Sequence, residues 1–600
     1  MGRETSDSPL LIFDGDCGFC RAWVEYWQSV TGERVRYAPF QQVGEQFPQL
    51  TRADFASAVK LILPDGEVRS GSHAVFTALA SSSDQRWILW LYENIPGLSM
   101  VCDAAYSVIA RHRSAAFQVT RVLWGIPVRA ETYSVTSWLF LRLLGAIYLV
   151  AFVSFGVQAE GLIGSRGILP ATEFLERAHE YLGASAYWNV PTLLWLNSSD
   201  LYVRAIWGVG ACLSFLLLSG VNTRVIRLGL FLLYLSLVTA GQVFMSYQWD
   251  ALLLEAGFLA VFLGSEVMMV RLFRWLLCRL MFLSGMVKLL SRDPTWRSFT
   301  ALPIHYQTQP LPTPLAWYFY QFPGWFQRLS VGSLFFVELV VPLLVLAPRR
   351  IRCFAASAIV LLQTLILLTG NYAFFNFLTI GLCLFALDDA ALKAVLPKRI
   401  MGLLPLTPSA KRPRVVWKAV CAGVVCLVLF SSGFEMAGEL SGRHWRLSEA
   451  VIRTIAPFEI VNTYGLFAVM TTSRPEIIIE GSNDGVTWHA YEFKYKPGDL
   501  TRRPAWVQPH QPRLDWQMWF AALGTYQTDP WILHFLQRLL EGSPQVIGLL
   551  GRNPFPQVPP HYVRAQVYEY RFTTREERQA TGEWWHREWK GIYVPAVGFR

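Results

Sequence analysis

The chain has 600 residues, of which 53% are hydrophobic and only 16% are charged, and its net charge is +10. Soluble globular proteins average roughly 25% charged residues, so this composition excludes an ordinary soluble protein and indicates a membrane protein. The basic residues lie at the ends of apolar stretches instead of forming one basic patch, so no nucleic-acid partner is expected.

The first predicted elements surround a pair of cysteines. Residues 10–13 form an apolar, strand-like run, and after Asp14-Gly15-Asp16 the motif C-x-x-C places Cys17 and Cys20 at the start of an amphipathic helix. Backbone N–H groups and the dipole at a helix N-terminus stabilise a thiolate, which is the nucleophile of thiol–disulfide exchange. Two intervening residues allow the second cysteine to resolve a mixed disulfide formed by the first. The motif therefore predicts a redox-active dithiol.

A metal site is the alternative interpretation of the same pair. A structural zinc ion takes about four ligands, and neither His73 nor Cys102 is part of a second paired spacing. The remaining cysteines are isolated in apolar runs, which argues against a secreted disulfide framework. The redox interpretation is favoured, and no metal or cofactor is expected.

The surrounding pattern predicts a small thioredoxin-like α/β domain over residues 1–125. Its expected elements are strand 9–14, helix 17–30, strand 34–40, strand 58–63, a turn at 64–66, strand 67–70 and helix 72–82. Residues 1–9 lack the basic flank and apolar core of a cleaved signal peptide. The domain is therefore expected to lie in the cytosol.

The middle of the chain, residues 126–433, is predicted to be a transmembrane helical bundle of about nine spans. The apolar stretches, each long enough to be weighed as a span, lie near 136–155, 202–220, 227–246, 250–265, 267–290, 329–347, 353–370, 372–388 and 415–433. The fourth and eighth are short, and could be re-entrant or buried.

Arginine and lysine residues beside the spans predict the orientation, because short cytoplasmic loops are enriched in them. Nine spans with a cytosolic N-terminus place these groups on one side: Arg111, Arg113, Arg121, Arg129; Arg224, Arg227; Arg271, Arg274; Arg349, Arg350, Arg352; Lys398, Arg399, Lys411, Arg412, Arg414. Segment 171–200 falls on the opposite side and is acidic, whereas loop 291–328, with three arginines, fits less well. The C-terminal region is therefore expected outside the cytosol.

Residues 434–600 are predicted to form an extracytoplasmic, β-rich soluble domain. The alternating run 476–480, the hairpin signal 483–485 and the strand-like segment 488–495 indicate a sheet, and helices are expected near 516–523 and 530–541. The region has no G-x-S-x-G nucleophile motif. Its tryptophans could form a packed core or a surface that binds a client protein.

Ionisable residues inside the predicted spans form a second group of candidates, because an unpaired charge in hydrocarbon is costly. They are Asp250, Glu255, Arg279, Lys288 and Glu338. They could pair across the bundle or lie near helix ends. Alternatively, Lys288 could act as a base if burial lowers its pKa. Asn371, Tyr372 and Asn376, which interrupt an apolar stretch, could line a site or form a simple turn.

Two family resemblances arise from these motifs. Residues 14–20 (DGDCGFC) resemble the signature of the DCC family of small thiol-disulfide oxidoreductases, over roughly residues 9–125. Residues 161–170 (GLIGSRGILP), 248–258 (QWDALLLEAGF) and 369–376 (TGNYAFFN) resemble lipase maturation factors. So do 481–485 (GSNDG) and 513–520 (RLDWQMWF) in the last domain.

The resemblance to lipase maturation factors implies a multi-pass membrane protein that assists the folding or assembly of an exported client such as a lipase. The fused dithiol domain implies a thiol redox partner and suggests a bacterial inner-membrane homologue, or the endoplasmic reticulum if the source is eukaryotic. More distantly, residues 284–289 (SGMVKL) resemble a segment of vitamin K-dependent carboxylases and place Lys288 at the position of a basic lysine. The alternative functions are accordingly a membrane-anchored protein-disulfide reductase, or a carboxylase-like membrane enzyme that uses Lys288.

Overall fold

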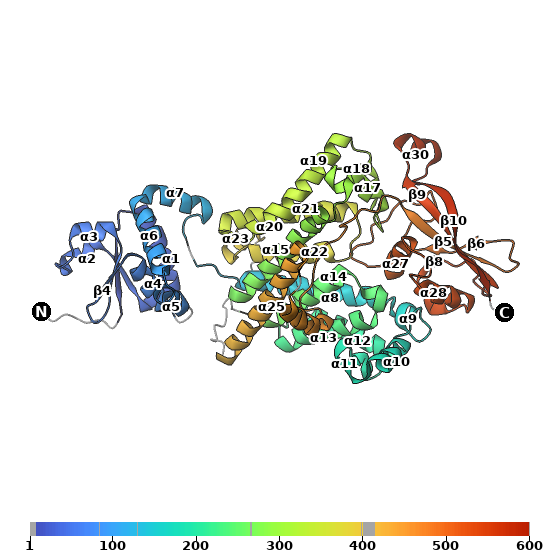
Figure 1. Cartoon of the computed structure of the whole chain (residues 1–600), viewed down its shortest axis with the longest axis horizontal. Helices are drawn as coiled ribbons and strands as arrows, with labels where there is room; N and C mark the ends of the chain where they lie inside the picture. Colours follow the sequence, from blue (N-terminus) through green and yellow to red (C-terminus); the bar gives the residue numbers. More distant parts are fainter. Residues whose placement is uncertain are drawn as a thin grey trace. The chain divides into compact units, whose positions relative to one another are not determined.

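The computed structural model describes residues 8–82, 85–128, 130–264, 267–397, 399, 415–443 and 445–598. The chain divides into two compact units, one built from Met1–Thr132 with Ala347–Cys353 and the other from Tyr133–Leu346 with Phe354–Arg600 (Figure 1). Each unit is described by itself.

The N-terminal unit is a mixed α/β domain with a four-stranded sheet in the order β2-β1-β3-β4. Strand β1 (Leu10–Phe13) is parallel to β2 (Arg36–Pro39) and antiparallel to β3 (Lys60–Ile62), which pairs with β4 (Val68–Ser70). The helices are α1 (Gly18–Thr31), α2 (Phe40–Val43), α3 (Arg52–Ser57), α4 (Gly71–Ala80), α5 (Arg86–Asn94), α6 (Leu98–Arg111) and α7 (Arg113–Leu123).

The predicted strands and the two predicted helices of this domain are confirmed, because apolar residues of each meet in one core. Leu11 of β1 and Leu61 of β3 are fully buried with Val24 of α1 and Ala74 of α4. Removing such side chains from water is the main favourable term in folding a domain of this size. Helices α5 to α7 were not predicted and complete the domain.

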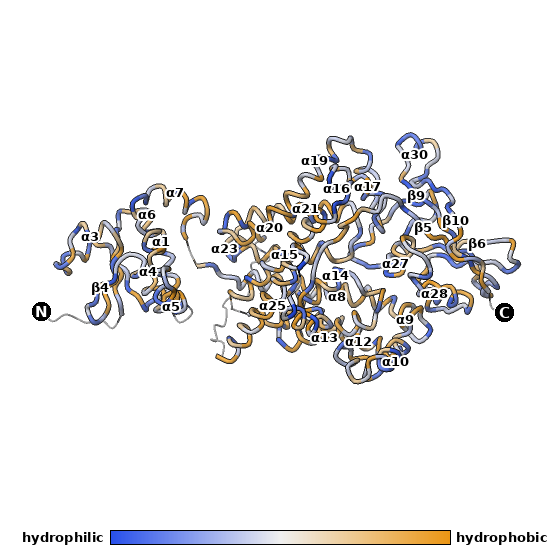
Figure 2. Tube along the Cα trace, in the orientation of Figure 1, coloured by the Kyte–Doolittle hydropathy of each residue, from blue (hydrophilic) through white to orange (hydrophobic). Residues whose placement is uncertain are grey.

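The second unit begins with a helical region, which is hydrophobic along much of its chain in Figure 2. Its principal helices are α8 (Ser134–Gly156), α9 (Ala159–Ile163), α10 (Ala171–Leu182), α12 (Asp200–Ser219), α13 (Arg224–Ala240), α14 (Gln248–Phe262), α15 (Val267–Leu290), α17 (Ala301–Thr308), α18 (Pro314–Tyr320), α19 (Gly324–Phe335), α20 (Val341–Leu344), α21 (Arg349–Thr369), α22 (Phe375–Cys383), α23 (Asp389–Val395) and α25 (Val415–Ser441). A π-helical turn, Phe336–Val340, joins α19 to α20.

Helices lie at all nine of the predicted spans, but fewer are long and apolar enough to cross a membrane alone. Within the described residues five helices qualify: Ser134–Gly156, Asp200–Ser219, Gly324–Leu344, Arg349–Thr369 and Val415–Ser441. Residues 375–395, bent by 117°, make six if they count as one span. Helices α13 and α14 have 17 and 15 residues, and α15 carries Arg271, Arg274, Arg279 and Lys288. The structure thus shows five or six candidate spans where the sequence predicted nine.

The C-terminal region contains the predicted β-sheet, four antiparallel strands in the order β10-β9-β5-β6. They are β10 (Trp585–Gly598), β9 (Tyr562–Phe572), β5 (Pro475–Ser482) and β6 (His489–Ala490), and β7 (Glu492–Phe493) pairs with β8 (Leu550–Arg552). Helices α27 (Arg513–Ala522) and α28 (Trp531–Leu540) confirm the two helices predicted there. Two further helices are α26 (Arg446–Ile455) and α30 (Arg575–Thr581).

The helical region and the C-terminal sheet share one hydrophobic core. Trp249 of α14 contacts Trp516 of α27, with ring centroids 4.8 Å apart, and Phe244 contacts Trp531 of α28 at 5.5 Å. Aromatic pairs at such distances bury large apolar areas. The tryptophans of α27 and α28 are therefore packing residues, which explains part of the aromatic richness noted in the sequence.

Candidate functional site

The dithiol lies where the chain leaves the sheet of the N-terminal unit. Strand β1 ends at Phe13, and Cys17 is the N-cap of α1, so its sulfur accepts a hydrogen bond from the Cys20 amide at 3.4 Å. The first-turn N–H groups of α1 and its dipole thus face the Cys17 sulfur. Both cysteines are free thiols. The structure places them at the helix N-terminus as the sequence predicted.

The two thiols have different surroundings. Cys17 is partly exposed, whereas Cys20 is only 8% exposed. Burial, with the hydrogen bond and charge of Cys17, raises the pKa of the Cys20 thiol to about 12. A thiol of that pKa is almost fully protonated near neutral pH. The arrangement suits Cys17 as the attacking thiol and Cys20 as the resolving thiol, which becomes nucleophilic only when a partner takes its proton.

The loop before the cysteines is held by one side chain that the sequence did not single out. The amide nitrogen of Gln41 donates to Asp14 Oδ1 at 2.9 Å and to Asp16 Oδ2 at 3.1 Å, and its oxygen accepts from the Gly15 amide at 3.1 Å. A Cβ on Gly15 would lie 2.7 Å from the Pro39 Cβ. The glycine of the motif is therefore required by the close approach of β2.

Arg113 of α7 also contacts this loop. Its guanidinium lies 3.5 Å from Asp14 Oδ2 and donates to the carbonyls of Ala56 and Ser57. Its positive charge favours the Cys20 thiolate, although burial outweighs it. Gln41 and Arg113 reach the motif only through tertiary contacts, so no local pattern could have indicated them.

No group of three or more His, Cys, Asp or Glu side chains is placed to hold a metal ion within the ranges that the structure describes. His73 lies 3.6 Å from Glu93. The donor set around Cys17 and Cys20 consists of two thiols beside an amide and carboxylates already engaged in hydrogen bonds. This geometry fits dithiol chemistry better than metal binding.

Of the alternatives left open for the ionisable residues of the helical region, the structure shows buried pairs, two of them within the bundle. Lys288 forms an ion pair with Glu338 at 2.9 Å, and Arg279 pairs with Glu255. Asp250 pairs with Arg513 through two hydrogen bonds of 2.8 and 2.9 Å, and both side chains are fully buried. Two of these carboxylates contact the C-terminal region: Asp250 through Arg513, and Glu255 through the Tyr464 hydroxyl, from which it accepts a hydrogen bond at 2.7 Å. The charges thus join the two regions of the second unit.

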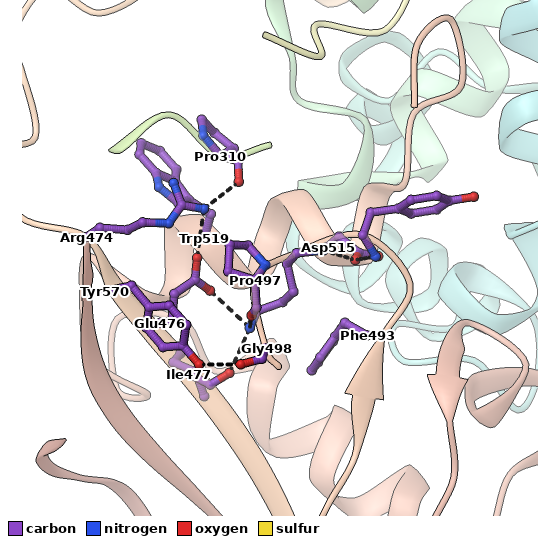
Figure 3. A network of polar contacts seen from close by, with 12 residues as sticks. Pro310, Arg474, Glu476, Ile477, Phe493, Pro497, Gly498, Asp515, Trp519 and Tyr570 are labelled. Carbon is purple, nitrogen blue, oxygen red and sulfur yellow. Dashed lines mark hydrogen bonds and ion pairs between the residues drawn. The ribbon is translucent and has the colours of Figure 1, made fainter. Parts of the chain in front are cut away.

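A polar network on the β-sheet side strengthens this junction (Figure 3). Arg474, at the start of β5, pairs with Glu476 at 2.8 Å and donates to the Pro310 carbonyl of the helical region at 2.8 Å. Lys496 pairs with Glu476 at 3.0 Å, and the Trp519 indole donates to the Thr308 carbonyl at 2.8 Å. All four of these side chains are buried. The network is accordingly a structural joint.

Lys288 itself lies in the wall of a cavity of about 480 Å³ between α15, α17, α19, α21 and α22. Tyr372 and Asn376, singled out in the sequence, line the same cavity, whereas Asn371 does not. Asn371 instead accepts from the Val507 and Gln508 amides at 2.8 and 3.2 Å. The predicted catalytic role of Lys288 stays a prediction, and its carboxylate partner holds the ammonium in place.

Comparison with known proteins matches each region to a described family. Residues 135–394 match the lipase maturation factor transmembrane domain, residues 460–595 the lipase maturation factor C-terminal domain, and residues 11–119 the DCC1-like thiol-disulfide oxidoreductase. Lipase maturation factor 2 of Gallus gallus is 36% identical over 581 residues, covering 76% of this chain and 81% of its own. The chain belongs to the lipase maturation factor family.

The family assignment extends to both kinds of animal relative. Lipase maturation factor 1 of Bos taurus is 36% identical and covers 78% of this chain and 90% of its own, and lipase maturation factor 2 of Xenopus tropicalis is 37% identical over 76% and 82%. No solved structure shows significant similarity to the chain. This lipase maturation factor is a membrane protein that carries a DCC1-like thiol-disulfide oxidoreductase domain in addition.

Proposed function

We propose that this chain assists the folding or assembly of an exported client of the lipase class, with its C-terminal sheet as the part that meets the client. The names of the relatives indicate the client class. The observation that carries the proposal is that the C-terminal region is fastened to the helical region by the buried Asp250–Arg513 ion pair, while β10 forms the edge of its sheet. Trp589 and Ile592 on β10 are 56% and 64% exposed, and an exposed strand edge is a ready template for an extended segment of another chain.

We further propose nine spans, with the N-terminus in the cytosol and the C-terminal sheet in the periplasm or lumen. The segments of the helical region that contact the C-terminal region support this count. Ser154 and Gln158, Phe244 and Asp250, and Thr308 and Pro310 contact it, as does Asn371. In a nine-span arrangement all of these lie at or beside the extracytoplasmic ends. Because Asp250 and Glu255 of α14 and Arg279 and Lys288 of α15 are buried in ion pairs, a short or charged helix is tolerated there.

The dithiol then works on the opposite face, as a cytosolic thiol-disulfide reductase with its own redox partner. Cytosolic pools keep thiols reduced, so Cys17 and Cys20 would be poised to reduce a disulfide and not to oxidise an exported protein. In such a cycle the Cys17 thiolate attacks a substrate disulfide and releases one thiolate. Cys20 then attacks the mixed disulfide, which leaves the substrate reduced and a Cys17–Cys20 disulfide. A cellular dithiol must restore the reduced pair.

Co-expression with an exported lipase tests the proposal. Replacing Trp589 and Ile592 with arginine should lower the secreted lipase activity strongly, whereas Val486→Arg, at a site off the edge strand that is 81% exposed, should leave it unchanged. Equal effects of both changes, or lipase activity that never depends on the chain, would refute the client role. Loss of lipase activity in a Cys17→Ser, Cys20→Ser variant would instead favour the alternative of a membrane-anchored disulfide reductase. Lys288→Met tests the carboxylase-like alternative in the same assay.

A further inference from the structure

The cavity beside Lys288 has the composition of a ligand site for a molecule from the bilayer. Its walls are mostly apolar side chains, among them Leu280, Phe319, Leu362 and Ile366, with few polar groups between them. Ligand sites typically enclose roughly 300–1,000 Å³ with an apolar lining and a few placed polar groups, and this cavity encloses about 480 Å³.

The cavity reaches the outer surface of two candidate spans. Leu329 of α19 and Leu361 and Leu365 of α21 line it, yet they are 62%, 62% and 42% exposed. Apolar side chains exposed on a span face lipid. An apolar molecule could thus enter from the hydrocarbon without crossing a polar surface.

The charged pair in the wall presents no free charge to a ligand. Lys288 has three N–H donors, and they meet the Ser284 carbonyl at 2.8 Å and the two Glu338 oxygens at 3.1 and 2.9 Å. The carboxylate balances the ammonium charge. An anionic head group would therefore lose its hydration without gaining a cation.

Two of the remaining polar atoms are acceptors. Asn376 is 1% exposed and donates its amide to Gln363 at 2.7 Å, while its Oδ1 has no hydrogen-bond partner within the described chain. The Tyr372 hydroxyl donates to Gln309 at 2.8 Å, so it accepts from His305 Nε2 at 2.9 Å. The proton on His305 then sits on Nε2, and Nδ1 is left as an acceptor.

His305 does not become a cation at ordinary pH. Burial and the neighbouring Lys288 charge lower the pKa of His305 to about 3. The lining thus contains two uncharged acceptors, Asn376 Oδ1 and His305 Nδ1, beside a neutralised ion pair. A buried acceptor without a donor costs free energy, which a ligand hydroxyl would recover.

We propose that this cavity binds an uncharged amphiphile from the membrane, with its apolar chain between α19 and α21 and a head-group hydroxyl that donates to Asn376 Oδ1. A second hydroxyl, where the head group has one, would donate to His305 Nδ1. Monoacylglycerol, diacylglycerol and long-chain alcohols share this chemistry. The cavity shares no residues with the dithiol or with the proposed client-binding strand, so the lipid-binding proposal can be tested separately from the function proposed above.

Three photoactivatable probes with one chain and different heads test the proposal on the purified full-length protein in nanodiscs. The alcohol should label peptides of α19 and α21, and its methyl ether, which cannot donate, should label about tenfold less. The carboxylate should label least. Unlabelled monoacylglycerol, diacylglycerol and long-chain alcohol compete in separate arms and identify the source. Equal labelling by the three probes would overturn the proposal.

Variants separate the cavity from lipid that merely coats the protein. Ala358→Phe, which fills the cavity, should abolish labelling by the alcohol, whereas Val209→Phe on the exposed face of α12 should not. Asn376→Leu should keep the label but erase the preference for alcohol over ether. Glu338→Gln leaves Lys288 uncompensated and should shift the preference to the carboxylate. If Ala358→Phe does not fold, the Asn376 and Glu338 variants still test the proposal. Unchanged preferences among the alcohol, ether and carboxylate probes in both variants would refute the proposed binding site.

Discussion

Replacing Arg513 with methionine tests whether the buried charges fasten the C-terminal sheet to the helical region. Arg513 and Asp250 are both fully buried, and Arg513 donates to both carboxylate oxygens and to the Phe244 carbonyl. Methionine keeps much of the apolar stem but leaves Asp250 with the Tyr234 hydroxyl as its remaining side-chain partner. Removing one member of a buried ion pair costs about 3–5 kcal/mol. The fraction of molecules with a detached sheet should rise on the order of 10²- to 10³-fold.

Tryptophan fluorescence during a urea titration in detergent follows the change, because Trp516 and Trp249 meet at this junction. A second variant with Asp250→Asn as well as Arg513→Met removes both charges and should recover at least about 2 kcal/mol of the loss. Arg177→Met breaks an exposed pair with Glu173 and should cost less than about 1 kcal/mol. A free energy of unfolding unchanged by Arg513→Met, or losses that simply add in the double variant, would refute the reasoning.

Three further predictions follow from the same structure. In peptide-resolved alkylation at pH 8, Cys20 of a Cys17→Ser variant should react more slowly than an ordinary cysteine, by about tenfold or more, because burial, the largest cause of its raised pKa, remains in the variant. Burial and the charges of Arg513 and Lys494 lower the pKa of His510 to about 4. The neutral side chain therefore contributes its whole stabilisation above about pH 6.5, and the free energy of unfolding should decrease as the pH drops toward 4. Gly161→Ala should destabilise the protein by about 1–3 kcal/mol, since its Cβ would lie 2.5 Å from the Gln545 carbonyl oxygen.

Each of these has an internal control. Cys17 in a Cys20→Ser variant should alkylate readily under the same conditions, and comparable rates for the two thiols would contradict the assigned roles. His510→Gln should flatten the acid limb, and an unchanged limb would show that other groups cause it. Gly208→Ala meets nothing within 4 Å and should be neutral or slightly stabilising, so an effect equal to that of Gly161→Ala would show that the contact with Gln545 is not the cause.

The N-terminal elements could be predicted because their signals are local. A continuous run of four apolar residues marks β1, and Cys17 caps the helix that follows it. Helices α5, α6 and α7 were not predicted. Many of their apolar side chains are exposed, for example Trp90 at 60% and Val108 at 58%. Their apolar residues nevertheless recur at helical spacing, so these three helices could have been predicted from the sequence. The contacts of Gln41 and Arg113 with the cysteine motif could not be predicted, since only the folded chain brings these side chains to the cysteines.

In the helical region, too, the sequence identified single residues but not their distant partners. The sequence identified Asp250, Glu255 and Lys288 as residues that need partners, because a charge in an apolar run is visible by itself. It did not indicate that Asp250 pairs with Arg513, which lies 263 positions away. Strands β9 and β10 were missed because their alternation is weak: β10 includes Glu588, Trp589 and Lys590 on an edge of the sheet.

The Asp250–Arg513 pair also sets an order of events during synthesis. Asp250 leaves the ribosome 263 residues before its partner, an interval of roughly 13–50 s at 5–20 residues per second. During that time the Asp250 carboxylate lacks its arginine and has the Tyr234 hydroxyl as its side-chain partner. The pair forms only after the last sixth of the chain is being made, so the packing of α14 against α27 is completed late in synthesis.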